Sequence, residues 1–95
     1  MTEAEARSAV ESACQRADVT LVEFAFYDRP GTYPLQFAGR DFEIPPFATH
    51  AILIVVTSKD GRKESAAFAS NERPCADLLE RFVYDFAVDW LVNVQ

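Results

Sequence analysis

The sequence is poor in the residues that build covalent or metal-held frameworks. It contains two cysteines and one histidine, too few for a disulfide framework or for the four ligands of a structural zinc site. It has only three glycines, and the phosphate-binding and nucleophile motifs GxxxxGKS/T, GxGxxG and GxSxG are all missing. The sequence therefore predicts no catalytic residues, no cofactor site and no metal site, and we expect a protein that is not an enzyme.

Long apolar runs and an excess of positive charge are missing too. The longest uncharged apolar run, from Ala51 to Val56, is far too short to span a membrane. The first residues, MTEAEARSAV, do not place an apolar run after a basic one, so we expect no signal peptide, a cytoplasmic location and no membrane contact. The net charge of −6 repels the phosphates of nucleic acid. We therefore expect no direct binding of nucleic acid.

Apolar side chains are abundant, at 49 % of the sequence, and their spacing predicts one domain over residues 1–95. Residues 2–17 are expected to form a helix that begins with a capping box of Thr2 and Glu5. Its buried stripe consists of small residues, namely Ala6, Ala9, Val10, Ala13, Cys14 and Ala17. Strands are expected over residues 19–27, 35–38, 50–58 and 62–70, with a hairpin turn at Asp60-Gly61 and a loop over residues 39–49.

The elements follow the order α-β-β-β-β-α, which predicts an α+β fold. We expect an antiparallel sheet of three to four strands, the second strand pairing with the first, and both terminal helices on one face. A similar order occurs in double-stranded-RNA-binding domains, whose last helix begins with basic residues. Here the last helix carries Asp77, Glu80, Asp85 and Asp89 against Arg81 alone. The resemblance to that family therefore ends at the order of the elements.

The last helix, expected over residues 75–94, is apolar on nearly all sides. One stripe is predicted to face the core, and it consists of Leu79, Phe82, Val83, Phe86, Trp90 and Val94. A helix that is apolar on its other side as well requires additional cover. We predict a protein-binding surface there, joined by two aromatic residues of the loop: Leu78, Tyr84, Asp85, Val88, Asp89, Leu91 and Val92, with Phe42 and Phe47. The alternative is that the first helix or a loop of the same chain covers these residues.

In size, acidity and lack of catalytic motifs, the chain resembles the small phage-encoded inhibitors called anti-CRISPR proteins. The resemblance rests on no motif and transfers no individual residue. It implies a protein partner with a basic surface, within a larger complex that binds nucleic acid in the bacterial or host cytoplasm. Two alternatives remain open: a homodimer joined through the last helix, with a structural or regulatory role, and a small enzyme or ligand-binding domain with a pocket near Cys75.

Overall fold

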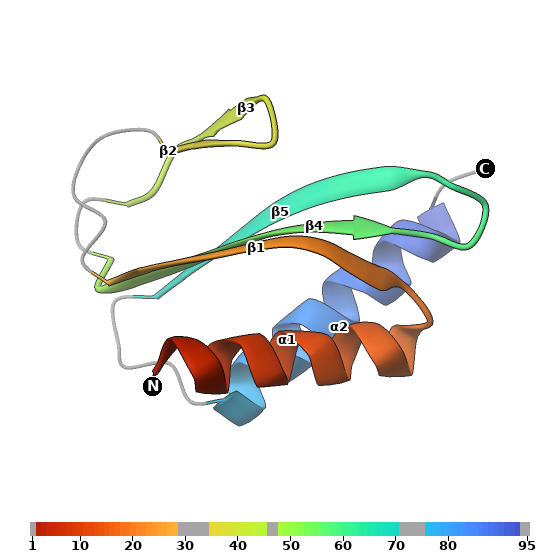
Figure 1. Ribbon diagram of the computed structural model, residues 1–95, viewed down its shortest axis with the longest axis horizontal. Helices are drawn as coiled ribbons and strands as arrows, with labels where there is room; N and C mark the ends of the chain where they lie inside the picture. The colour runs from red at the N-terminus through yellow and green to blue at the C-terminus, as the bar shows by residue number, and fades with distance from the viewer. Residues whose placement is uncertain (1, 29–34, 46–47, 71–75, 94–95) are drawn as a thin grey trace.

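Two helices lie on one face of a three-stranded antiparallel sheet, and a short hairpin lies over the other face (Figure 1). The computed structural model describes residues 2–28, 35–45, 48–70 and 76–93. Its elements are α1 (Glu3–Ala17), β1 (Thr20–Asp28), β2 (Leu35–Phe37), β3 (Arg40–Phe42), β4 (His50–Thr57), β5 (Lys63–Ser70) and α2 (Ala76–Asn93). The predicted α+β fold, with a helix at each end and the antiparallel sheet between them, is confirmed.

Helix α1 begins and ends as its sequence dictates. The Glu5 amide donates to Thr2 Oγ1 at 3.1 Å, and the Thr2 amide donates to Glu5 Oε1 at 3.2 Å, which completes the predicted capping box. The helix ends at Asp18, whose φ of 64° is left-handed, a conformation that aspartate tolerates better than most residues. Within the residues that the structure describes, neither this helix nor any other has the length and hydropathy to cross a membrane.

The sheet has the order β1-β4-β5, so β4 is the central strand and pairs antiparallel with both neighbours. Residues 51–56 of β4 are buried on both faces, as the continuous apolar run predicts. Ile52, Ile54 and Val56 face the helices and belong to the main core cluster. Ala51 and Leu53 point to the opposite face and belong to a second, smaller cluster.

The prediction that the second strand pairs with the first is wrong. Strand β2 pairs instead with β3, which lies inside the segment predicted to be a loop. The turn between them consists of Ala38 and Gly39, with φ values of 54° and 75°. Two successive positive φ angles make the tight hairpin turn that matches strand twist, but alanine is an unusual residue at its first position, so the sequence signal was weak.

The hairpin covers part of the second sheet face. Phe37 and Phe42 pack against the cluster that includes Ala51 and Leu53. Arg40 anchors the hairpin to β5, since its Nη1 donates to Ser65 Oγ at 2.9 Å and to Glu64 Oε1 at 3.1 Å. The helices thus cover one face of the sheet, and the hairpin covers part of the other face.

Candidate functional site

Helix α2 buries Leu79 and Val83 of the predicted stripe, together with Ala87, which the prediction omitted. Its most buried residues are Leu79, Val83 and Ala87, which are 3 %, 0 % and 0 % exposed. Phe82, predicted to face the core, is 55 % exposed, so that prediction is wrong. Phe86 and Trp90 are half-buried, and Val94 lies outside the described residues.

The neighbours of α2 explain this orientation. On one flank, Phe86 meets Phe68 of β5 edge to face with ring centroids 5.9 Å apart, and Arg62 lies 5.7 Å above the Trp90 ring. On the other side lies α1, whose buried stripe of small residues lets the two helices approach closely. The buried arc of α2 is therefore turned toward Ala87, because α2 packs against α1 as well as against the sheet.

Tyr84, Val88 and Leu91, which were predicted to lie away from the core, pack partly buried against it. Helix α1 covers Tyr84 directly, because the Arg16 guanidinium lies 4.6 Å from the centre of the Tyr84 ring. Arg16 Nη1 also lies 3.0 Å from Glu80 Oε1, to which the Ser12 hydroxyl donates at 3.0 Å. These three residues therefore fit the alternative prediction, in which the same chain covers them, better than the prediction that they project outward.

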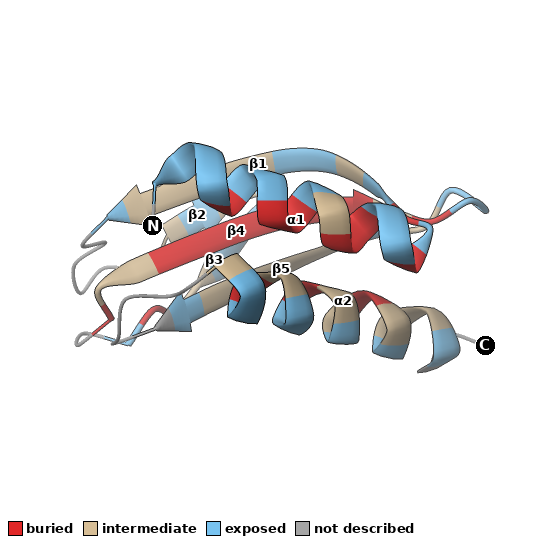
Figure 2. Cartoon of the chain, turned by 90° about the horizontal axis from the view of Figure 1, so that it is seen from below, coloured by how far each residue is buried: buried red, intermediate tan, exposed pale blue. Residues whose placement is uncertain are grey.

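The remaining predicted residues of α2 form an exposed surface with Phe82. Four large apolar side chains are exposed in the described part of the chain, and three of them, Leu78 (48 %), Phe82 (55 %) and Val92 (67 %), belong to α2. Asp85 and Asp89 are exposed between them. We call Leu78, Phe82, Asp85, Asp89 and Val92 the outer face of α2. Figure 2 shows that the exposed residues of α2 gather on the side turned away from α1.

The two carboxylates of this outer face form no ion pair within the described part of the chain. Most basic side chains of the described chain contact a carboxylate of the same chain: Arg7, Arg16, Arg40, Lys59 and Arg62. Among the residues that the structure places, neither Asp85 nor Asp89 forms an ion pair. The outer face of α2 therefore combines apolar area with two carboxylates that no ion pair of the described residues neutralises, although the exposed Arg81 lies one helical turn before Asp85.

The structure does not bring the loop aromatics to this surface. Phe42 is half-buried in the second core cluster, where the Arg40 guanidinium lies 4.9 Å above its ring. It belongs to β3, across the sheet from α2 (Figure 1). Phe47 lies outside the described residues. Of the predicted protein-binding residues, Leu78, Asp85, Asp89 and Val92 are thus exposed together, and sequence analysis missed Phe82.

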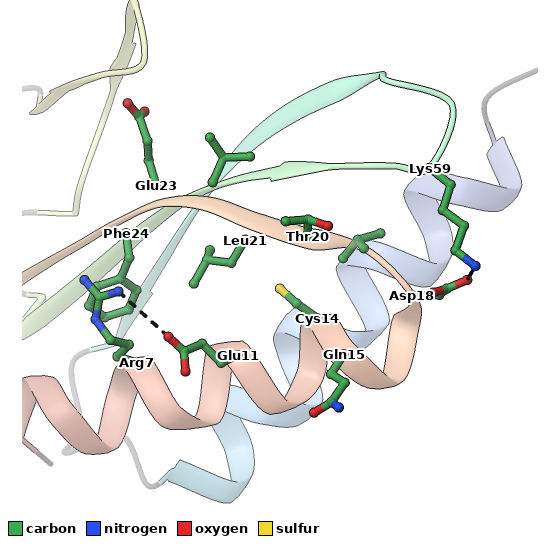
Figure 3. Close-up of a pocket in the computed structure, with 12 residues that line it drawn as sticks. Arg7, Glu11, Cys14, Gln15, Asp18, Thr20, Leu21, Glu23, Phe24 and Lys59 are labelled. Atoms are coloured by element: carbon green, nitrogen blue, oxygen red, sulfur yellow. Dashed lines mark ion pairs between the residues drawn. The ribbon is translucent and has the colours of Figure 1, made fainter.

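A groove with a volume of about 490 Å³ lies between α1 and the edge strand β1 (Figure 3). Four of its five charged groups form ion pairs, because Lys59 Nζ lies 2.8 Å from Asp18 Oδ2 and Arg7 Nη1 lies 3.8 Å from Glu11 Oε1, and Glu23 is the fifth. Burial, with a smaller effect of Glu11, raises the pKa of the Cys14 thiol to about 11. The thiol is therefore protonated at neutral pH, and this groove supplies no thiolate nucleophile.

The single histidine has local partners at the end of the sheet. His50 Nδ1 lies 3.1 Å from Thr49 Oγ1, and its Nε2 lies 3.6 Å from Asp28 Oδ1. Cys75, near which the enzyme or ligand-binding alternative places a pocket, lies outside the described residues. In the described segments, no three His, Cys, Asp or Glu side chains come together in a way that would hold a metal ion.

Comparisons with protein-family models, with curated proteins and with solved structures found no match to this chain.

Proposed function

We propose that this chain is a protein-binding module that docks through the outer face of α2 on a basic surface of another protein. The observation that carries the proposal is the coincidence of exposed apolar side chains and exposed carboxylates on one side of one helix. Single exposed apolar residues are ordinary on protein surfaces. Three on one helix face, with polar residues beside them, are typical of a contact surface.

The two kinds of side chain contribute differently to such a contact. Full burial of a Leu, Phe or Val side chain stabilises a complex by roughly 1.5–3 kcal/mol, and Phe82 gains about half of that because it is 55 % exposed in the free chain. Carboxylates contribute mainly specificity and a faster encounter with a positively charged surface. The apolar residues therefore provide affinity, while Asp85 and Asp89 select a partner that carries lysine or arginine.

A basic surface on a larger complex is often one that holds nucleic acid. A chain with a net charge of −6 that binds such a surface blocks phosphate binding there by occupation and by repulsion. The proposal therefore includes an inhibitory role of the anti-CRISPR type, in which the chain competes with nucleic acid for a protein surface. The support for this finer proposal is the charge of the chain and the character of the outer face of α2.

Affinity capture with matched variants tests the proposal. The tagged wild-type chain, Phe82→Ser and Val22→Ser are each incubated with a bacterial lysate, and the retained proteins are identified by mass spectrometry. Val22 is a suitable control because it is 47 % exposed but lies on β1. We expect a partner that wild type and Val22→Ser retain and that Phe82→Ser retains about tenfold less, as is typical of a central interface residue. Equal retention by all three variants overturns the proposed surface.

A competition experiment tests the inhibitory role separately. Adding nucleic acid to the captured complex releases the partner if the two compete for one basic surface. Retention of the partner at saturating nucleic acid would leave a protein-binding module but contradict the inhibitory role.

A further inference from the structure

The outer face of α2 has the spacing of a coiled-coil seam. Its residues, Leu78, Phe82, Asp85, Asp89 and Val92, follow one another at intervals of four, three, four and three residues. This alternation of four and three places every residue of the set along one narrow line that a second helix can follow. The line extends for about 21 Å at 1.5 Å per residue, which is close to four helical turns.

The two aspartates occupy positions inside this seam rather than at its margins. Positions 78, 82 and 92 are apolar, whereas the third and fourth positions carry Asp85 and Asp89. A charged residue inside a seam lowers affinity for any partner that leaves it unpaired, because the charge loses water without gaining a counter-ion. Charged and polar seam residues therefore specify the partner and its register.

A second copy of this chain fits the seam poorly. Parallel pairing in register sets each of Asp85 and Asp89 against its own counterpart. Antiparallel pairing, in which the two kinds of seam position face each other, sets Asp85 either against Phe82 or against Asp89 of the other copy. Both arrangements bury carboxylates against one another or against a phenyl ring. The charge pattern therefore disfavours a homodimer through this face and favours a different helix with complementary charge.

We infer that the outer face of α2 pairs with a helix of the partner protein that carries two lysine or arginine residues flanked by apolar residues at seam spacing. This inference rests on the proposed function and names the kind of partner element that the surface accepts. The basic pair lies opposite Asp85 and Asp89, and the apolar residues cover Leu78, Phe82 and Val92. Long basic side chains suit this arrangement, since their methylene stems pack on the apolar residues while the cationic groups reach the carboxylates.

Synthetic helical peptides of about 25 residues, long enough to be helical, test the inference. One peptide places lysines at the third and fourth of five otherwise leucine seam positions, which suits parallel pairing. Another places them at the second and third positions, which suits antiparallel pairing. Two control peptides carry glutamates in place of the lysines. Binding to the wild-type chain is measured by fluorescence anisotropy, and the oligomeric state of the chain by sedimentation.

We expect one lysine peptide to bind at least roughly tenfold more tightly than its glutamate counterpart. Which of the two lysine peptides binds shows whether the partner helix runs parallel or antiparallel to α2. The double variant Asp85→Lys with Asp89→Lys should reverse this preference. The control Asp41→Lys with Glu43→Lys makes the same change in net charge at exposed positions near β3 and should keep it. Equal binding of all peptides, no binding, or a wild-type chain that dimerises through α2 overturns the inference. If Phe82-dependent capture of a partner persists when no peptide binds, the proposed function stands and only the helical partner is wrong.

Discussion

Helices α1 and α2 pack on the same face of one sheet but present opposite kinds of outer surface. The exposed side of α1 is polar, with Glu3, Arg7, Glu11, Gln15 and Arg16. The exposed side of α2 carries Leu78, Phe82 and Val92 around two aspartates. Water is an adequate neighbour for the first surface and a poor one for the second. The contrast shows that packing within this chain satisfies α1 completely and α2 on only part of its circumference.

The largest expected effect comes from a substitution on the buried side of α2. We expect Val83→Asp to cost more than 4 kcal/mol and to unfold much of the protein, because it places an unpaired carboxylate at a position that is 0 % exposed. The matched change Phe82→Asp should cost about 1 kcal/mol or less, because that side chain already meets water. Urea denaturation followed by circular dichroism measures both. Equal destabilisation by the two variants would mean that α2 is oriented differently.

The two helices also differ in how far their sequences determine their orientation. All six small residues of the predicted α1 stripe, Ala6 to Ala17, are buried, because polar residues on the other side leave only one way to face the core. In α2, apolar residues surround the helix, and the wheel favoured large side chains such as Phe82 over Ala87. The contact with α1 turns Ala87 rather than Phe82 toward the core. The periodicity of a single helix contains no information about such a neighbouring helix.

The sheet shows the same limit. The two-sided burial of β4 was predictable, because its run from Ala51 to Val56 is apolar on both faces. The hairpin of β2 and β3 was not, because its turn begins at Ala38, which gives no local sign of a positive φ. Of the candidate site, the sequence indicated the helix and its mixed apolar and acidic character, whereas the identity of the exposed set required the tertiary packing.

A second prediction concerns the buried side of α1, where Cys14 should make the stability of the fold depend on pH. The folded chain raises the pKa of Cys14 to about 11 from an ordinary value of 9.0, chiefly by burial. The folded state therefore holds this proton more tightly than the unfolded state does. Its stabilising effect is complete below pH 9, and stability is lost as pH rises toward 11. We expect the wild type to lose about 2 kcal/mol more than Cys14→Ala across this interval.

Paired denaturation curves at the two ends of the interval isolate this effect, because other alkaline titrations occur in both proteins. Slow alkylation of Cys14 by iodoacetamide at neutral pH is a further expectation, because the thiol is buried and protonated. Parallel loss of stability in wild type and Cys14→Ala would show that the thiol does not govern the pH dependence.

A third prediction concerns the aspartates that interrupt the apolar outer face of α2. Asp85→Leu with Asp89→Leu converts the outer face of α2 into an uninterrupted apolar seam, so we expect self-association at least roughly tenfold stronger than that of the wild type. The control Ala4→Leu with Ser8→Leu adds leucines at the same spacing on the exposed side of α1, where the surroundings are polar. Sedimentation equilibrium should detect dimers only of the first variant. A monomeric Asp85→Leu, Asp89→Leu protein would argue against the seam.

The smallest expected effect lies where the two helices meet. Arg16 is 57 % exposed, yet it contacts both the Glu80 carboxylate at 3.0 Å and the face of the Tyr84 ring at 4.6 Å. An exposed ion pair contributes little on its own, so we expect a double-mutant cycle between Arg16→Ala and Glu80→Ala to give a coupling of about 0.5 kcal/mol. The same cycle between Arg7 and Glu11, an exposed pair within α1 at 3.8 Å, should give less. A coupling near zero between Arg16 and Glu80 would mean that the contact between the helices rests on their apolar residues and on the Arg16–Tyr84 contact alone.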